Sequence, residues 1–303
     1  MPTSSYYDNS YAPNAAPYYD NNYEASNKHL PIVLCLDISP SMNGPNAPHA
    51  PKKRWELQND AVEKFLCEIA RATKSRNTAE IAFIAFSDKI VCETGFMPLS
   101  QLNFDQLRCE GKPVLSKQTE AVVKEDNHFY PMKLTVPVFK PVSVEAGTHL
   151  SPVLNRAVQM LEDRRITIKK LNHDYYTPFL VLSTDYDHHG LYESHSEYFS
   201  KKSEDIAMLQ SKCDDGLNAS EMIVPFIVGI GSDVENTRLR EYSVGFRDGY
   251  ITVPDETSYN KDEQYSLSNM FRAIAKAIAD STTCKGGAKD LKELLSDRIA
   301  DVQ

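Results

Sequence analysis

Leu30-Pro-Ile-Val-Leu-Cys-Leu-Asp-Ile-Ser-Pro-Ser-Met42 is the stretch of sequence on which the predicted fold depends. Residues 32–36 form an unbroken apolar run, which predicts a strand that is buried on both faces of a sheet. Asp37, Ser39 and Ser41 follow directly, so three oxygen-bearing side chains meet where the strand ends. Carboxylate and hydroxyl oxygens, without histidine or cysteine, suit a hard cation such as Mg²⁺ or Mn²⁺. In α/β sheets, ligands lie beyond the carboxyl ends of the strands, which is where this run stops.

A simpler interpretation of these residues is purely structural. Asp37 would then be a helix N-cap, and Ser39 and Ser41 would be turn residues. Two later segments favour a metal site over that interpretation. Ala146-Gly147-Thr148-His149-Leu150 opens a helical pattern, and Phe179-Leu180-Val181-Leu182-Ser183-Thr184-Asp185 is a second buried strand that ends in an acid. Together with Asp37, Ser39 and Ser41, these segments resemble the site motifs of one known family, and three fragments in the right order make a chance resemblance much less frequent than one motif alone.

The pattern Asp-x-Ser-x-Ser resembles the metal-ion-dependent adhesion site (MIDAS) of von Willebrand factor A (vWA) domains. This resemblance implies that Thr148 and Asp185 complete the site, with the metal ligands Asp37, Ser39, Ser41, Thr148 and Asp185. It also implies a doubly wound, Rossmann-like vWA fold, with a mostly parallel six-stranded sheet, one antiparallel edge strand and helices on both faces. The alternation of apolar strands with amphipathic helices along the chain independently predicts a mostly parallel sheet covered on both faces.

Three further segments narrow the resemblance to the bacterial TerY/YegL-type vWA proteins. They are Leu30-Pro31, Asp174-Tyr175-Tyr176-Thr177-Pro178 and Val224-Pro225-Phe226-Ile227-Val228-Gly229-Ile230-Gly231. Those proteins are associated with tellurium-resistance and stress-response gene clusters, where the vWA domain accompanies a protein kinase and a phosphatase. Pro40 and Tyr186 stand where that family commonly has glycine.

The chain is predicted to divide into three parts. Residues 1–28 are rich in Tyr, Asn and Pro and poor in aliphatic residues, so we expect a disordered tail that is either an interaction segment or inert. Residues 29–281 form the vWA domain, with an insertion at about 95–144 that contains no long periodic segment. This insertion flanks the metal site or only covers the edge strand, and Pro137 confines any strand within it to an edge. Residues 282–303 form a linker and a C-terminal amphipathic helix.

Composition limits the partners and the compartment. The 303 residues carry a net charge of −9 with a pI of about 5.4, which argues against nucleic acid or an anionic membrane as the main partner. No apolar run approaches the roughly 20 residues of a membrane span, and no basic-then-apolar signal segment opens the chain. The six cysteines show no CxxC spacing, which favours a reducing, cytoplasmic location without a disulfide framework.

The resemblance implies a non-enzymatic, metal-dependent protein-binding module. In that family an acidic side chain of a protein partner often caps the ion, so a protein partner that supplies an acidic ligand is expected here. The module would act as an adaptor or scaffold in a stress-response or tellurium-resistance-like system with kinase and phosphatase partners. One alternative is a Mg²⁺-dependent phosphatase or other hydrolase, although Ser39 stands where such enzymes need a second acid. His188 and His189 could act as a base or an extra ligand, but no nucleophile is identifiable. The other is a metal-free scaffold that acts through the tail and the insertion.

Overall fold

The structure is a computed structural model that describes most of the chain. The described residues are 28–44, 52–125, 128–143, 147–185, 194–230, 239–243, 250–253, 266–284 and 286–300. The predicted disordered tail lies outside them except for Lys28, as do Tyr186, His188 and His189.

The main sheet contains eight strands and is mixed. Its strands are β1 (Lys28–Asp37), β2 (Ala79–Phe86), β3 (Ile90–Glu93), β4 (Met97–Pro98), β9 (Asp174–Tyr175), β10 (Phe179–Thr184), β11 (Val224–Ile230) and β12 (Tyr250–Val253). Their order is β12-β11-β10-β1-β2-β3, with β4 paired to β2 and β9 paired to β1. β12, β11, β10, β1 and β2 are parallel, whereas β3 and β4 run antiparallel to β2. The predicted α/β class is therefore confirmed, but the expected six-stranded sheet is wrong in detail, because the short β4 and β9 extend it.

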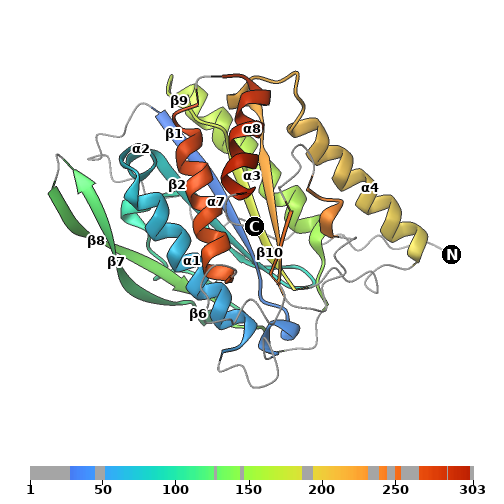
Figure 1. Cartoon of the computed structure of the whole chain (residues 1–303). Helices are drawn as coiled ribbons and strands as arrows, with labels where there is room; N and C mark the ends of the chain where they lie inside the picture. Colours follow the sequence, from blue (N-terminus) through green and yellow to red (C-terminus); the bar gives the residue numbers. More distant parts are fainter. Residues whose placement is uncertain are drawn as a thin grey trace.

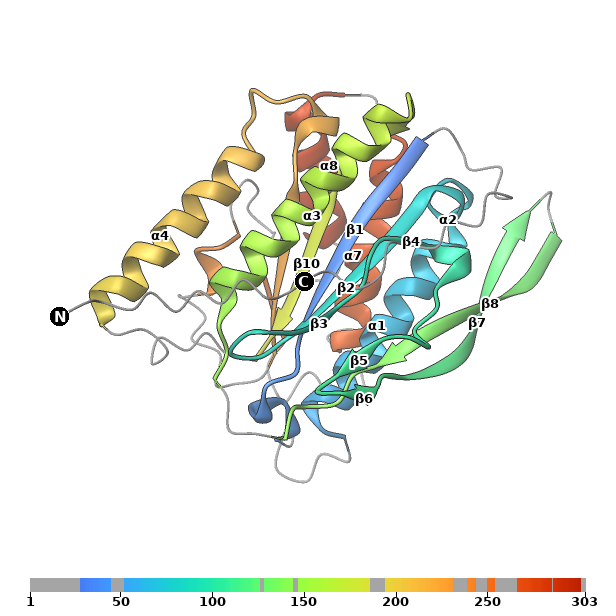
Figure 2. The same cartoon turned by 180° about the vertical axis from the view of Figure 1, so that it is seen from behind.

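Helices cover both faces of this sheet. They are α1 (Arg54–Arg71), α2 (Thr73–Thr78), α3 (Leu150–Lys170), α4 (His195–Lys212), α7 (Leu267–Ser281) and α8 (Ala288–Ala300). α1 and α7 lie side by side in front of β1 in Figure 1, and α8 packs beside α7. The view from behind in Figure 2 shows α3 crossing the opposite face, with α4 beyond it.

The apolar pattern of β1 explains why this strand lies in the middle of the molecule. Leu30, Ile32, Leu34 and Leu36 belong to the apolar core under α1 and α7. The side chains of residues 33 and 35, between them, belong to the second core, under α3. Successive side chains of a strand point to opposite faces, so an unbroken apolar run is stable only between two helical layers.

The predicted insertion contains a long β-hairpin that the sequence did not predict. β7 (Leu115–Glu125) pairs antiparallel with β8 (His128–Val138), and the two strands form a sheet of their own beside α1. Ala121 and Val123 are buried toward α1, whereas Val122 between them is 56% exposed. The polar residues of the first half of β7 hide this alternation in the sequence. Pro137 does lie in a strand with a free edge, as expected.

The same region carries a disulfide that contradicts the prediction from the cysteine spacing. Cys92 of β3 is bonded to Cys109 of β5 (Arg108–Cys109), which pairs with β6 (Lys112–Pro113). Cys35, Cys67, Cys213 and Cys284 are free thiols. The expectation that none of the six cysteines pairs is therefore wrong, because the fold brings together two residues that the sequence separates by 17 positions.

The helix α8 (Ala288–Ala300) lies in the part of the chain for which a C-terminal amphipathic helix was predicted. Leu291, Leu295 and Ile299 are buried in the core that lies under α1 and α7. This helix therefore docks on the same unit as the rest of the chain. Among the described residues, no helix is both long enough and apolar enough to cross a lipid bilayer.

Candidate functional site at the carboxyl edge of the sheet

Asp37 ends β1 and is completely buried at the carboxyl edge of the sheet. Its Oδ1 accepts a hydrogen bond from the backbone N–H of Ser39 at 2.7 Å, which is the local turn bond that the structural interpretation expects. Its Oδ2 faces away from that turn and accepts hydrogen bonds from Thr184 at 2.6 Å and from Thr148 at 3.4 Å. A helix N-cap has no need of such distant partners, so Asp37 is more than a local turn residue.

The short 3₁₀ turn η1 (Pro40–Asn43) positions the two serines: Ser39 is its N-cap, and Ser41 lies within it. Ser41 donates a hydrogen bond to Asp185 Oδ1 at 2.9 Å, and the two serine Oγ atoms lie 2.8 Å apart. Ser39 is buried and Ser41 is exposed, so the cluster opens to solvent on the side of Ser41.

Thr148 and Asp185 reach the same place from two other segments. Asp185 directly follows β10, the parallel neighbour of β1, so the two strands deliver their acids to one edge. Thr148 precedes α3, and the backbone N–H of the next residue, His149, is anchored to the carbonyl of Ser87 at 2.9 Å. We call Asp37, Ser39, Ser41, Thr148 and Asp185 the polar cluster. All the residues predicted from the sequence therefore come together.

Three neighbours of the polar cluster were missed by the sequence analysis. Thr184 hydrogen-bonds Asp37, and Gln58 of α1 donates to the backbone carbonyl of Asp37 at 2.9 Å. Arg54, the first residue of α1, donates from Nη1 to Asp185 Oδ2 at 2.9 Å, and both side chains are buried. A cation at a helix N-terminus is unfavourable because it opposes the helix dipole. This unusual position is the sequence signal by which Arg54 could have been recognised as part of the site.

The charge balance of the polar cluster is uneven. Burial, together with the charge of Asp185, raises the pKa of Asp37 to about 7. Burial also raises the pKa of Asp185, although Arg54 and the hydrogen bond from Ser41 act in the opposite direction. Among the described residues, two carboxylates thus share a desolvated space with one guanidinium, and one of the carboxylates ionises only near neutral pH.

The donor set of the polar cluster fits a hard cation. It offers two carboxylates and three hydroxyls, and such oxygen ligands suit Mg²⁺ or Mn²⁺. Among the described residues, no three His, Cys, Asp or Glu side chains gather into a metal-binding group. The polar cluster holds only two carboxylates, so a cation there would depend on the hydroxyl ligands as well.

The end of the predicted insertion passes close to the cluster. The backbone N–H of Val142 donates to the carbonyl of Ile38 at 2.8 Å, and Asn59 of α1 holds Phe139 through both its backbone N–H and its carbonyl. The hairpin itself packs along the side of α1. The return segment of the insertion therefore lies beside the cluster, whereas its hairpin packs along α1.

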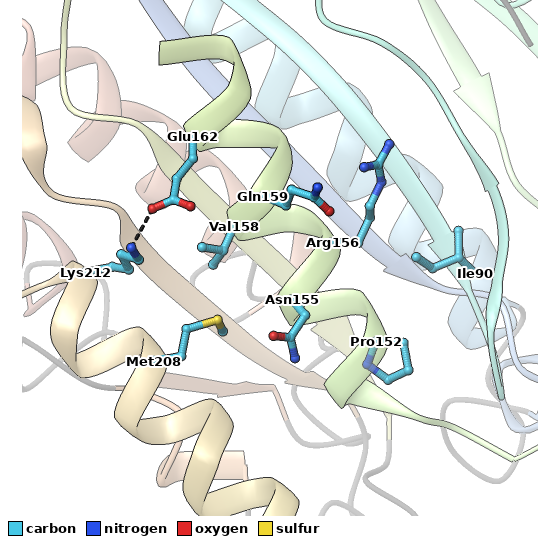
Figure 3. A pocket seen from close by; sticks show the side chains of 9 residues that line it. All are labelled: Ile90, Pro152, Asn155, Arg156, Val158, Gln159, Glu162, Met208 and Lys212. Carbon is cyan, nitrogen blue, oxygen red and sulfur yellow. Dashed lines mark ion pairs between the residues drawn. The ribbon is translucent and has the colours of Figure 1, made fainter. Parts of the chain in front are cut away.

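A cavity of about 600 Å³ lies elsewhere, between α3 and α4. Figure 3 shows its lining, in which Lys212 forms an ion pair with Glu162 at 2.5 Å. Arg156, also on its wall, binds Glu93 through two hydrogen bonds. Because its cationic groups are engaged by carboxylates, this cavity does not rival the polar cluster as the functional site.

Comparison with known proteins gives only remote similarity. No family model matches the chain, and no curated protein matches it. One similar solved structure is proximal thread matrix protein 1 from the mussel byssus, with a TM-score of 0.43 and 14% identity over 83% of this chain and 46% of that one. The PilB minor pilin from Streptococcus sanguinis has a TM-score of 0.47 and 12% identity, over 85% of this chain and 64% of that one. The pilus adhesin SpaC from Lactobacillus rhamnosus GG has a TM-score of 0.39 and 13% identity, over 91% and 30%.

These findings correct the family prediction. The solved structures described above are a byssus protein and two pilus proteins, and no family model matches the chain, so the predicted membership of the TerY/YegL-type vWA family is contradicted. The predicted MIDAS-dependent adaptor of a stress-response or tellurium-resistance-like system, which rested on that membership, is contradicted as well. This chain spans less than two thirds of each of the three structures described above, and similarity at this level transfers no activity to it.

Proposed function

We propose that this protein binds a hard divalent cation, Mg²⁺ or Mn²⁺, at the polar cluster. The observation that carries the proposal is the meeting of three distant segments at one point. Hydrogen bonds join Asp37 to Thr148 across 111 positions and Ser41 to Asp185 across 144 positions. The proposal rests on these side chains and on their charges, and on no family membership.

The uneven charge is the second support. A buried carboxylate pair is stable only when protons, hydrogen bonds or a cation offset its repulsion. The raised pKa of Asp37 shows that the hydrogen bonds from Thr184 and Ser39 do not offset it fully. A divalent cation would supply the missing positive charge. Ser39, Ser41 and Thr148 would bind it directly, and Asp37 and Asp185 would bind it or hold its water ligands.

Several finer expectations stay predictions. Helices on both faces of a largely parallel sheet support a doubly wound arrangement. Catalysis is not expected, and the measurement for it is turnover of a phosphate ester such as p-nitrophenyl phosphate. A protein partner that supplies an acidic group, rather than nucleic acid or membrane, stays a prediction about the chain. A cytoplasmic location also stays a prediction, but the Cys92–Cys109 disulfide removes the cysteine argument for it, and cell fractionation would check it.

The direct experiment is calorimetric titration of the purified protein with Mg²⁺ and Mn²⁺ at pH 8. We expect the wild type to bind a single ion, and Asp37→Asn to weaken binding about 100-fold or more, because a carboxylate ligand is lost. The matched control is Asp205→Asn. Asp205 is also a buried aspartate with a raised pKa, and the hydrogen bonds that it accepts come from Ser151 and Asn155 of α3, which are not members of the polar cluster.

The control variant should bind as the wild type does. A wild-type protein that shows no heat of binding at millimolar Mg²⁺ and Mn²⁺ would refute the proposal. So would an Asp37→Asn variant with unchanged affinity, because the ion would then be bound elsewhere. Circular dichroism of all three proteins establishes that any loss is not caused by unfolding.

A further inference from the structure

Arg54 places a permanent positive charge in the polar cluster. Its Nη1 lies 2.9 Å from Asp185 Oδ2, and the exposed fractions of the two side chains are 8% and 0%. Ser41 occupies the other oxygen of the same carboxylate, Oδ1, at 2.9 Å. Both oxygens of Asp185 are therefore engaged, one by a hydroxyl that a cation can use as a ligand and the other by a charge that repels a cation.

The position of Arg54 in its helix is unfavourable by local rules. As the first residue of α1, it lies at the helix end that carries the partial positive charge, where anions are preferred. The long side chain is also buried at a cost in rotamer entropy. Neither local structure nor solvent explains this placement, whereas the carboxylate of Asp185, 131 positions along the chain, does.

The backbone of Arg54 is also tied to the loop that carries the serines. Its N–H donates to the carbonyl of Gly44 at 3.3 Å, and Gly44 directly follows η1. This hydrogen bond joins the start of α1 to the turn that holds Ser41. The backbone of Arg54 is thus placed beside the polar cluster, where its guanidinium reaches Asp185.

We propose that Arg54 is the built-in counter-ion of the polar cluster, which weakens divalent cation binding and selects against Ca²⁺. This inference rests on the proposed cation site. In the cation-free protein, Arg54 offsets part of the repulsion between Asp37 and Asp185. When a cation enters, the same guanidinium opposes it across a short, desolvated distance, where charge interactions are strong.

The selectivity follows from how Arg54 occupies Asp185. Ca²⁺ takes six to eight oxygen ligands and often binds a carboxylate through both oxygens, whereas Mg²⁺ keeps a compact octahedral shell. With Oδ2 held by Arg54, Asp185 can offer only Oδ1 to an ion. Two-oxygen coordination by this carboxylate is thereby blocked, which disfavours Ca²⁺ more than Mg²⁺.

The test is titration of the full chain with Mg²⁺ and, separately, with Ca²⁺, comparing the wild type, Arg54→Met and Arg54→Lys. Removing the charge in Arg54→Met should tighten Mg²⁺ binding about tenfold or more, by the strength of charge interactions in a desolvated site. Ca²⁺ affinity should rise by a larger factor, because Oδ2 of Asp185 becomes available. Arg54→Lys keeps the charge and should stay within about threefold of the wild type for Mg²⁺.

The matched control is Arg71→Met, which removes an arginine from the other end of α1, where it forms an exposed ion pair with Glu68. It should leave both affinities unchanged. If Arg54→Met does not fold, Arg54→Gln removes the same charge while keeping a hydrogen-bond donor, and it should also tighten Mg²⁺ binding. Thermal unfolding without added metal provides a second readout, in which Arg54→Met should be less stable than the wild type and regain more stability on Mg²⁺ addition.

The two proposals fail in different ways. Wild-type protein that binds Mg²⁺, together with charge-removing variants at position 54 that bind it equally or more weakly, overturns the role of Arg54 and leaves the cation site in place. Equal gains for Mg²⁺ and Ca²⁺ in Arg54→Met overturn the selectivity. Absence of binding in the wild type and in every variant overturns the cation site and this inference together.

Discussion

At the amino end of β1, His29 lies against Glu80, whereas at the carboxyl end of the same strand Asp37 lies near Asp185. Glu80 is held by Arg164 through Nε at 2.7 Å and Nη2 at 2.5 Å, and by His29 at 3.0 Å. We call His29, Glu80, Arg164 and His173 the amino-end cluster, because His173 in turn hydrogen-bonds His29 at 2.9 Å. Glu80 and Asp37 are both buried carboxylates on neighbouring strands of the same sheet, so their surroundings are comparable.

The two clusters differ in charge balance, and the pKa values show it. Burial alone would raise the pKa of Glu80, but hydrogen bonds from His29 and Arg164 outweigh it and lower this pKa. At the other end, burial prevails over the hydrogen bonds and raises the pKa of Asp37 to about 7. One carboxylate with one bidentate arginine is a closed structural unit. Two ionised carboxylates that share one arginine carry a net negative charge, and this makes the carboxyl edge a candidate for cation binding.

The largest expected effect belongs to the amino-end cluster. Arg164→Met leaves Glu80 buried without its main counter-charge, which should lower the free energy of unfolding by about 3–5 kcal/mol. Urea unfolding at pH 7 measures this loss. Mg²⁺ affinity of the folded fraction should not change, and a change of more than about threefold would show that the two ends of β1 are coupled.

The second prediction concerns pH and the polar cluster. Because the pKa of Asp37 is higher in the folded chain than in the unfolded chain, the folded state binds more protons over that interval. Without metal, stability should therefore fall as pH rises from about 4 to 7 and level off above 7, by an amount on the order of 1–3 kcal/mol. Chemical unfolding at a series of pH values measures this slope.

Asp37→Asn should remove most of that slope and be more stable than the wild type at pH 8 without metal. In the wild type, saturating Mg²⁺ should also flatten the slope, because the ion binds the ionised carboxylate. A wild type whose metal-free stability rises between pH 4 and 7 would contradict the raised pKa of Asp37, unless the stability of Asp37→Asn rises more steeply over the same interval.

A smaller effect is expected at the solvent side of the polar cluster. Ser41→Ala removes the hydroxyl that donates to Asp185, which should reduce Mg²⁺ affinity about tenfold while costing about 1 kcal/mol of stability. Calorimetry and thermal unfolding measure the two quantities. Ser211→Ala is a suitable control, because this exposed serine donates only to a carbonyl within α4. Equal metal affinity in Ser41→Ala and wild type would remove Ser41 from the ligand set.

The smallest expected effect is that of His173→Gln in the amino-end cluster. The variant loses a part-buried hydrogen bond to His29, but the pairing of Glu80 with Arg164 remains. We expect a loss of about 0.5–1 kcal/mol in unfolding free energy and no change in Mg²⁺ binding. A loss as large as that of Arg164→Met would mean that the histidine pair, and not the arginine, neutralises Glu80.

The polar cluster was predictable because each of its segments can be recognised from a short local pattern in the sequence. Asp37 and Asp185 each follow an apolar strand, and parallel neighbours carry their final residues to the same edge. The hairpin of β7 and β8 was not predictable in this way. Its inward positions alternate with polar ones only in part, and Lys117 faces α1 through ion pairs with Asp60 and Glu63. The disulfide was also missed, since the spacing of Cys92 and Cys109 carries no recognisable motif.

The sequence by itself determined which strands are buried on both faces, where they end and which oxygen-bearing residues follow them. It did so because side-chain alternation and strand termination are properties of neighbouring residues. Only the tertiary structure decided that Arg54 meets Asp185 while Arg164 meets Glu80. Those pairings depend on how α1 and α3 pack against the sheet. The partner of a buried charge is close to it in space but far from it along the chain, so no local sequence pattern indicates the pairing.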